Sequence, residues 1–308
     1  MILGIDPKVD YAFKWLFGRE VNKGLLISLL HAVLLWLLDK PITAIELLNP
    51  YNDKESLSDK LSILDIKARD QQGHQFNVEM HMLARRMLFA SRVLYYWSKL
   101  YPSRISEGED YHLLRPTFSV NFVNSVVYPK TPDYFHTFRL RSDANHDLMF
   151  SQQMAVQVIE LPKFTKKVEE LTTPLDAWCY FLRHAETMDP ENLPAILKDS
   201  PVGQAMEVLR VLTQDEIERE RYEARLKKQR DDNWLLYASR EEGREEGFAD
   251  GIEKGIEKGI EKGELIGKIH FCQQLLKQSL TSRDVLAKLS ETELKGLLSE
   301  VEAKALPR

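Results

Sequence analysis

The sequence predicts a mixed α/β fold that is followed by a helical C-terminal region. Three observations indicate this fold: helical and β-type spacings of apolar residues alternate up to about residue 170, a hairpin signature surrounds Gly73, and helical spacing broken by prolines follows Leu171. The 308 residues are enough for about two structural units. With 44% hydrophobic and 29% charged residues, the chain has the composition of a soluble globular protein, which excludes a disordered or fibrous one.

Two helices are expected at the N-terminus. The segment that starts at Asp6 has apolar residues at helical spacing and ends at Gly18, and a more apolar helix covers Leu25–Leu38. Ser28 and His31 interrupt the second run, which is shorter than the about 20 residues that span a membrane. We therefore expect a buried helix and no membrane association. Acidic residues precede this run and no small-residue cleavage site follows it, which also excludes a signal peptide.

Three strands and a helix are expected next. The first strand lies between Pro41 and Pro50, where β-tolerant apolar residues cluster before a polar loop. The segments LSILDIKARD and QFNVEMHML then form a predicted hairpin, and Gly73 supplies its turn. Helical spacing returns from about Leu83 and ends before Pro102.

Two further strands, in PTFSVNFVNSVVY and MAVQVIEL, complete the predicted sheet. We divide the chain into a core over residues 1–170, a helical extension with a charged linker over residues 171–240, and a glycine-repeat tail over residues 241–308. The linker is rich in both charge signs from about Asp215 to Glu246, which is typical of a solvated helix or arm.

The tail contains an internal repeat, in which glycine occupies every fourth position from Gly243 to Gly267 around a GIEK unit. Four residues overshoot a helical turn by about 40°, so the glycines form a slowly winding stripe. Each glycine costs roughly 1 kcal/mol relative to alanine. Either the glycines allow another helix to approach closely, or the tail is flexible until it binds. Two amphipathic helices are expected after the repeat, and they suit self-association into a homo-oligomer.

The net charge and the cysteine content limit the possible functions and the cellular compartment of the protein. A formal net charge of -5 excludes a histone-like protein coated with lysine, so any contact with DNA must come from a local patch. Cys179 and Cys272 lie far apart and form no CxxC pair, which excludes a zinc signature and is typical of a reducing compartment. We expect a cytoplasmic protein.

Asp65, Glu79 and His81 are the candidate site residues. Glu79 and His81 are two residues apart on one strand and share a face, and the hairpin at Gly73 can bring that face beside Asp65. Two carboxylates are the ligands that magnesium or manganese prefers, and such ions also accept phosphate oxygens. The pattern suits phosphodiester hydrolysis, although a solvated strand face has the same spacing.

A resemblance to a known family strengthens the interpretation of these residues as a site for phosphodiester hydrolysis. The ordered segments DPKVDYAFKWLFG, LSILDIKARDQQGHQFNVEMH, RVLYYWSKLY, GEDYHLLRPTFSVNFVN and VIELPKF resemble the Rpn family of recombination-promoting nucleases, also described as transposases of the PD-(D/E)xK superfamily. The similarity covers roughly residues 5 to 240. It implies a restriction-endonuclease-like mixed sheet flanked by helices, and a magnesium-dependent DNA endonuclease whose cleavage supports recombination of mobile elements. Mn²⁺ and Ca²⁺ are the alternative cofactors.

The resemblance also assigns roles to residues. It implies that Asp65 and Glu79 bind the metal and that Asp10 adds an acidic group to the metal's outer shell. The superfamily's lysine is commonly glutamine in this family, whereas this sequence has His81. A neutral histidine would accept a proton, orient water or bind a softer metal. Alternatively, it marks a weakened enzyme. Lys163 belongs to the ELPKF segment of the resemblance, and the sequence indicates no role for it.

Three basic residues, Arg85, Arg92 and Lys99, are spaced by seven and lie near one helix face, where they would follow a DNA backbone. Ordinary surface cations have the same spacing. Two alternatives to an active endonuclease therefore remain open. One is a catalytically weakened DNA-binding or assembly protein on a nuclease scaffold, and the other is a tail that acts as a protein-interaction module.

Overall fold

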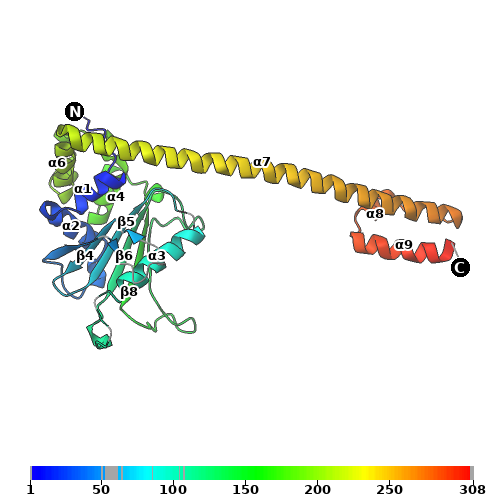
Figure 1. The fold of residues 1–308 in the computed structure, drawn as a ribbon, viewed down its shortest axis with the longest axis horizontal. Coiled ribbons are helices and arrows are strands. Elements are labelled where there is room, and N and C mark those ends of the chain that lie inside the picture. Colours follow the sequence, from blue (N-terminus) through cyan, green and yellow to red (C-terminus); the bar gives the residue numbers. More distant parts are fainter. Residues whose placement is uncertain are drawn as a thin grey trace. The chain divides into compact units, whose positions relative to one another are not determined.

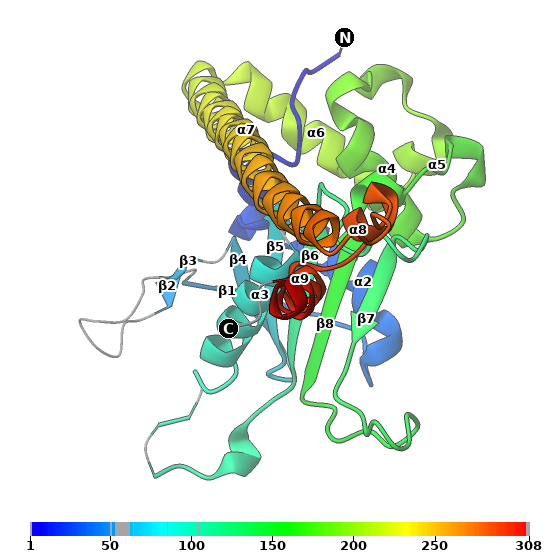
Figure 2. The ribbon, with the colours of Figure 1, turned by 90° about the vertical axis from the view of Figure 1, so that its right-hand side faces the viewer.

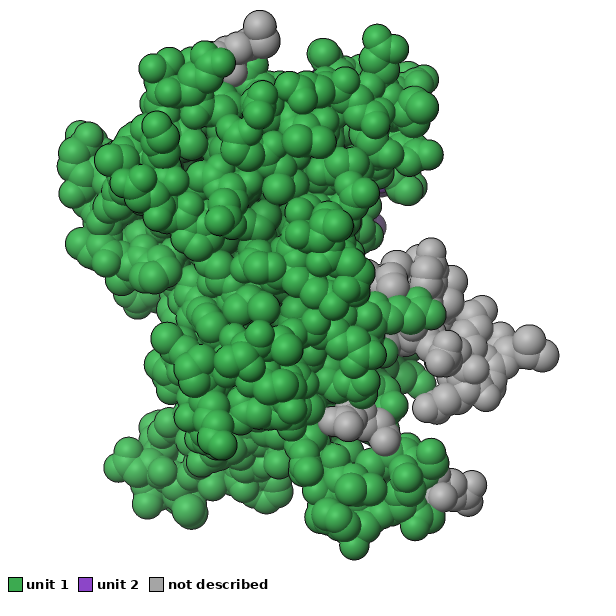
Figure 3. Space-filling model, turned by 90° about the vertical axis from the view of Figure 1, so that its left-hand side faces the viewer, with its two compact units in different colours: residues 1–229 green, residues 230–308 purple. Residues whose placement is uncertain are grey.

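The computed structural model describes residues 2–49, 51–52, 62–63, 65–84, 86–103, 105–106 and 108–305. The chain forms two compact units, residues 1–229 and residues 230–308. Figure 3 shows one face of the first unit in green. Residues 171–229 thus lie in the same unit as the sheet. Arg85, one of the three predicted DNA contacts, lies outside the described residues.

A six-stranded mixed sheet forms the centre of the first unit (Figure 1). Its strands, in their order across the sheet, are β1 (Ile45–Leu48), β4 (Ile66–Asp70), β5 (Gln75–His81), β6 (Thr117–Val123), β8 (Met154–Glu160) and β7 (Phe135–Phe138). The pairs β5/β6 and β6/β8 are parallel, and the other neighbours are antiparallel. Two short strands, β2 (Tyr51–Asn52) and β3 (Ser62–Ile63), pair separately. The predicted mixed sheet is confirmed.

The hairpin between β4 and β5 forms where the sequence predicts it. Gly73 has a φ of 86°, a backbone conformation that side-chain-bearing residues rarely adopt. Its N–H donates to the carbonyl of Asp70 at 3.0 Å, and the N–H of Asp70 donates to the carbonyl of His74 at 3.1 Å. The turn therefore sets the register that places Ile66 opposite Val78.

Helices flank the sheet on both faces (Figure 2). The α-helices are α1 (Asp10–Phe17), α2 (Lys23–Leu34), α3 (Arg86–Leu100), α4 (Pro174–His184), α5 (Ala195–Lys198), α6 (Pro201–Gln214), α7 (Glu216–Leu275), α8 (Arg283–Ala287) and α9 (Glu291–Ala305). Short 3₁₀ helices span Glu20–Asn22, Leu35–Leu37, Tyr111–Leu113, Leu161–Lys163, Val168–Glu170, Ala185–Thr187 and Pro190–Asn192.

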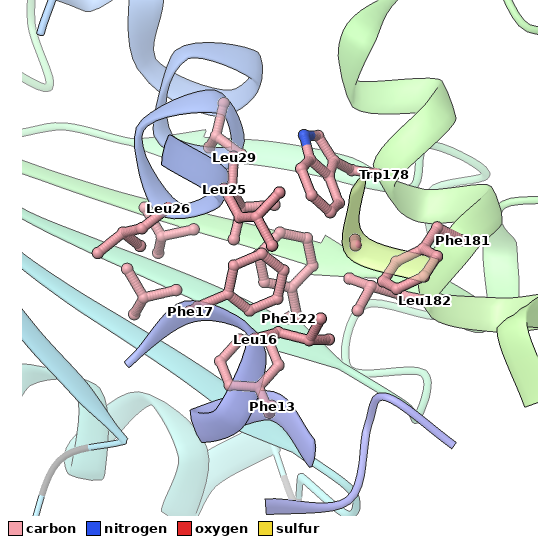
Figure 4. Close-up of a cluster of buried hydrophobic side chains, with 14 of the residues drawn as sticks. Phe13, Leu16, Phe17, Leu25, Leu26, Leu29, Phe122, Trp178, Phe181 and Leu182 are labelled. Atoms are coloured by element: carbon pink, nitrogen blue, oxygen red, sulfur yellow. The ribbon is translucent and has the colours of Figure 1, made fainter. Parts of the chain in front are cut away.

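The main core lies between one sheet face and α1, α2, α4 and α6 (Figure 4). Alternate residues of β6, among them Phe122, face these helices, and Phe17 of α1 meets Trp178 of α4 edge to face at 5.3 Å. The apolar run Glu20–Leu37 has a mean hydropathy of 1.4, enough to be considered for a membrane span. Its helix α2 instead packs into this core, where a fully buried leucine contributes roughly 1.5–3 kcal/mol.

Helix α7 begins inside the first unit. Tyr222, at its N-terminal end, is 2% exposed, and its hydroxyl accepts a hydrogen bond from the N–H of Asp6 at 2.8 Å. Leu226, one turn later, packs against the same core. The charged segment expected to be a linker is therefore helical and starts as part of the core, because these two residues anchor it.

The second unit contains the rest of α7 together with α8 and α9. Its small core consists of Ile269, Cys272, Leu286, Leu294, Leu298 and Val301. The glycine repeat is helical. Apart from neighbouring residues and the nearby backbone of α7 itself, no described heavy atom lies within 4 Å of the position that a Cβ would take at Gly243, Gly247, Gly251, Gly255, Gly259, Gly263 and Gly267. Of the two short amphipathic helices predicted after the repeat, the first, HFCQQLLKQSL, begins as the C-terminal end of α7, and the second, ELKGLLSEVEAK, lies in α9. The short helix α8 was not predicted.

Candidate active site

Asp65 and Glu79 lie beside each other at one end of the β4–β5 hairpin. Asp65 directly precedes β4, and its N–H donates to Oε1 of Glu79 at 3.4 Å. Oδ2 of Asp65 accepts from the N–H of Met80 at 2.9 Å. Each carboxylate therefore bonds to the backbone of the neighbouring segment, and the hairpin register fixes their separation. The sequence-based expectation that these two residues meet agrees with this arrangement.

Burial gives this pair an unusual charge state. Glu79 is 1% exposed, and its Oε2 has no hydrogen-bond partner among the described residues. Burial raises the pKa of Glu79 to about 8, repulsion from Asp65 adds to this rise, and Arg92 partly opposes it. Burial likewise raises the pKa of Asp65, against the hydrogen bond from Met80. Two buried carboxyl groups side by side favour a proton or a cation between them.

The donor set fits a hard divalent cation. Carboxylate oxygens are the ligands that Mg²⁺ and Ca²⁺ prefer, and Oε2 of Glu79 accepts no hydrogen bond in the described part of the chain, where Arg92 approaches it only to 3.7 Å. No group of three or more His, Cys, Asp and Glu residues has metal-binding geometry among the described residues. A protein with only two carboxylate ligands suits Mg²⁺, because this ion usually keeps several of its waters.

His81 lies on the same strand face as Glu79 but is directed at a different partner. Its Nε2 lies 3.2 Å from Oδ1 of Asn121, and its ring meets Phe89 edge to face at 5.1 Å. The amide nitrogen of Asn121 donates to three acceptors around Ser119 and Gln157, so Oδ1 accepts and Nε2 of His81 carries the proton. Burial lowers the pKa of His81 to about 4, which leaves the ring neutral. The expected convergence of three ligands is therefore absent from the described residues.

Asp10 reaches the site through a lysine. Nζ of Lys14 lies 2.6 Å from Oδ1 of Asp10 and 3.5 Å from Oδ1 of Asp65. Burial alone would lower the pKa of Lys14, but the two carboxylates outweigh burial and raise it. Sequence analysis placed Asp10 in the metal's outer shell and did not single out Lys14, because no local pattern links Lys14 to Asp65, 51 residues later.

The basic face of α3 carries Arg92 and Lys99. Nη2 of Arg92 lies 3.7 Å from Oε2 of Glu79, and its guanidinium stacks 5.1 Å from the centre of the Tyr96 ring. The Arg92 side chain is 52% exposed and so reaches both Glu79 and solvent. Lys99 follows seven residues later, about 10 Å further along the helix.

Polar residues continue beneath α3 along the sheet. Asn77, Ser119 and Asn121 are at most 1% exposed and share the sheet face of Glu79. The side-chain amide of Asn77 lowers the pKa of Glu79 and so favours its charged form. However, neither the amide nitrogen nor the amide oxygen of Asn77 makes a hydrogen bond of ordinary geometry to a described residue. Sequence reasoning missed these residues, although polar residues at alternate positions of TFSVNFV were a signal for them.

The structure gives Lys163 of the ELPKF segment a role. Its ammonium donates to Oε2 of Glu160 at 2.6 Å and to the carbonyl of Tyr128 at 2.7 Å. Oε1 of Glu160 accepts from the N–H groups of Val127 and Tyr128 at 2.5 and 3.0 Å. These bonds fasten the connection between β6 and β7 to the end of β8, so Lys163 stabilises the fold.

Comparison with known proteins agrees with this geometry. A family model described as PD-(D/E)XK nuclease family transposase matches residues 7–239, which include the sheet, the carboxylate pair and Lys14. A search of curated proteins and of solved structures gave no match. Nucleases of this family generally use divalent metals, and the family implies DNA as the substrate. The match covers most of the chain, and the chain therefore belongs to the family of PD-(D/E)XK nuclease family transposases.

Proposed function

We propose that this protein is a divalent-metal-dependent DNA endonuclease whose cleavage supports recombination of mobile elements. The observation that carries the proposal is the buried Asp65–Glu79 pair, in which Oε2 of Glu79 has no hydrogen-bond partner among the described residues. A buried carboxylate is costly unless it is protonated, paired or bound to a metal, and Arg92, 3.7 Å from Oε2, offsets the burial of Glu79 only in part. The family match supports nuclease chemistry at this position.

Each site residue has a proposed role. Asp65 and Glu79 would hold the metal, with Mg²⁺ as the first choice and Mn²⁺ or Ca²⁺ as alternatives. When bound, the cation would lower the pKa of a water molecule and polarise the scissile phosphate. Arg92 and Lys99 would contact the DNA backbone. Because each phosphate contact releases about one counterion, Arg92→Ala should reduce the slope of log affinity against log salt by about 1.

Nicking of supercoiled plasmid tests the proposal. Wild-type protein would be assayed with Mg²⁺, Mn²⁺ or Ca²⁺ beside Asp65→Asn, Glu79→Gln and His81→Gln. Glu20→Gln is the matched control, because Glu20 pairs with Lys23 at the surface. We expect metal-dependent cutting that both carboxylate variants lose and the control retains. A folded wild-type protein that cuts with none of these metals would contradict the proposal.

A catalytically weakened DNA-binding scaffold is the second candidate. It is favoured by His81, which is neutral and hydrogen-bonded to Asn121 where the superfamily has a lysine. The two candidates differ in one result of the nicking assay. A scaffold would bind DNA with a salt dependence yet cut none, whereas an enzyme would cut at a rate that depends on Glu79.

We further propose that the tail assembles the protein into homo-oligomers in the cytoplasm. Support comes from Phe248, Ile252, Ile256 and Ile260, which are 49–72% exposed on α7 next to the repeated glycines. The two free, buried cysteines suit a reducing compartment. Ile252→Ser with Ile256→Ser should lower the mass measured by light scattering, while Val211→Ser, at a similarly exposed position of α6, should not. An unchanged mass in the tail variant would contradict assembly through this stripe.

A further inference from the structure

The position of the lysine in the superfamily's PD-(D/E)xK motif holds no cation in this chain. His81 stands there, and it is buried, neutral and hydrogen-bonded to Asn121. A positively charged amine nevertheless lies beside the carboxylate pair. Nζ of Lys14 is 3.5 Å from Oδ1 of Asp65, and it comes from helix α1 instead of from the sheet.

Helix α1 holds Lys14 firmly at this place. Phe13 and Phe17 flank Lys14 in the sequence and are fully buried, and the Phe13 ring lies 6.5 Å from that of Phe122 on β6. Asp10, one turn earlier, fixes the ammonium at 2.6 Å. The Lys14 side chain is 36% exposed, so the ammonium is positioned by the core and still accessible to a substrate.

Arg92 is a second cation at the site among the described residues, and its chemistry differs. Its planar guanidinium stacks on Tyr96 and lies nearest Glu79, whereas Lys14 lies nearest Asp65. An ammonium is a compact charge with three donors, as in the motif lysine, while a guanidinium suits a flat, two-point contact with phosphate. Of the two, Lys14 matches the missing group.

We propose that Lys14 supplies, from α1, the ammonium that the lysine of the PD-(D/E)xK motif supplies from the strand elsewhere in the superfamily, and that it donates to a non-bridging oxygen of the scissile phosphate beside Asp65. This inference rests on the nuclease function proposed above. It makes Asp10 a positioning residue, which holds Lys14 toward the substrate and does not itself bind the metal.

The experiment compares wild type with Lys14→Met, Lys14→Arg and a matched control, Lys23→Met. Lys23 is a partly exposed lysine of the same unit that pairs with Glu20 away from the carboxylates. Three quantities are measured: binding of Ca²⁺ alone by calorimetry, binding of a labelled duplex in Ca²⁺ by fluorescence anisotropy, and nicking in Mg²⁺. Ca²⁺ serves as the probe for the binding steps.

Lys14→Met should bind Ca²⁺ at least as tightly as wild type, because a repelling cation has been removed from the site. The same variant should bind the duplex about tenfold more weakly, since a charge-assisted hydrogen bond is lost. Its nicking should fall by roughly 100-fold. Lys14→Arg should recover most of the duplex binding, and Lys23→Met should match wild type in all three assays.

Two outcomes would overturn the inference. If Lys14→Met loses Ca²⁺ binding together with duplex binding, Lys14 only supports the carboxylates structurally. If it binds the duplex in Ca²⁺ as tightly as wild type, Lys14 makes no phosphate contact. Both outcomes are measured by binding and do not require cleavage. If wild type does not cut DNA, the proposed nuclease function is contradicted, but duplex binding still decides whether Lys14 contacts phosphate.

Discussion

The two faces of the neighbouring strands β5 and β6 differ in composition, although alternate residues of the same strands supply them. On β6, Val120 and Phe122 face the core under α1, α2 and α4, whereas Ser119 and Asn121 face α3. All four are fully buried. Burying apolar surface stabilises a fold, while burying polar groups costs stability unless every group is paired. One face therefore maintains the fold, and we propose that the other carries the chemistry.

The largest effect is expected on the apolar face. Phe122→Ala removes a fully buried ring that packs against Phe13, and it should lower the free energy of unfolding by about 3–5 kcal/mol. Urea unfolding monitored by circular dichroism would measure this. Phe150→Ala is the control, because Phe150 is 84% exposed and its loss should change stability little. Equal effects of the two variants would contradict the assignment of the core.

The next effect concerns pH and the metal-free carboxylate pair. The pKa of Glu79 is about 8 in the folded protein against an ordinary value of 4.5, so between these values the folded state keeps a proton that the unfolded chain releases. Stability attributable to Glu79 is therefore fully present below pH 4.5 and falls as pH rises toward 8, by at most roughly 1.4 kcal/mol per pH unit.

Glu79→Gln removes this titration and sharpens the comparison. In EDTA the variant should lose the slope that wild type shows over this window, and it should be the more stable protein above pH 8. Urea unfolding at several pH values measures the difference in the free energy of unfolding between wild type and Glu79→Gln. Other titrating groups contribute equally to both proteins and cancel in this difference. Parallel stability curves for both proteins would show that Glu79 is not protonated in the fold.

A smaller effect is expected from Asn77, whose amide lacks ordinary hydrogen bonds to described residues. Asn77→Leu replaces a buried polar group with an apolar one of similar volume, and it should raise the free energy of unfolding by about 1 kcal/mol. Thermal unfolding would measure this gain. A loss of stability of similar size would show instead that Asn77 has partners and belongs to a satisfied network.

The smallest effect is expected in the second unit. Gly255→Ala on α7 meets open space in the described structure and should stabilise the helix by about 0.5–1 kcal/mol. Circular dichroism at 222 nm during heating would detect the gain. Lower helicity, or a changed oligomer mass, would show that the missing side chain is needed for close approach of another helix.

Much of the fold could be predicted because its signals are local. The turn at Gly73 and the alternation along β5 are readable from a few residues, and together they placed Asp65 beside Glu79. The helix α2 was predicted from its apolar run in the same way.

The features that sequence reasoning missed depend on contacts between distant segments. Lys14 meets Asp65 only because α1 packs across the sheet, and Tyr222 anchors α7 only because Asp6 lies beside it. The glycine repeat is a different case. Because glycine has a low helix propensity, the sequence allowed a flexible tail as an alternative, whereas in the structure α7 continues through the repeat.

The most direct test of the central claim, that Asp65 and Glu79 form a metal site, is calorimetric titration with Mg²⁺ at pH 7 in buffers of different ionisation enthalpy. Because the pKa of Glu79 is about 8, wild type should bind the ion and release close to one proton, and Glu79→Gln should lose both binding and release. Equal Mg²⁺ binding by wild type and Glu79→Gln, or no binding by folded wild type, would contradict the account.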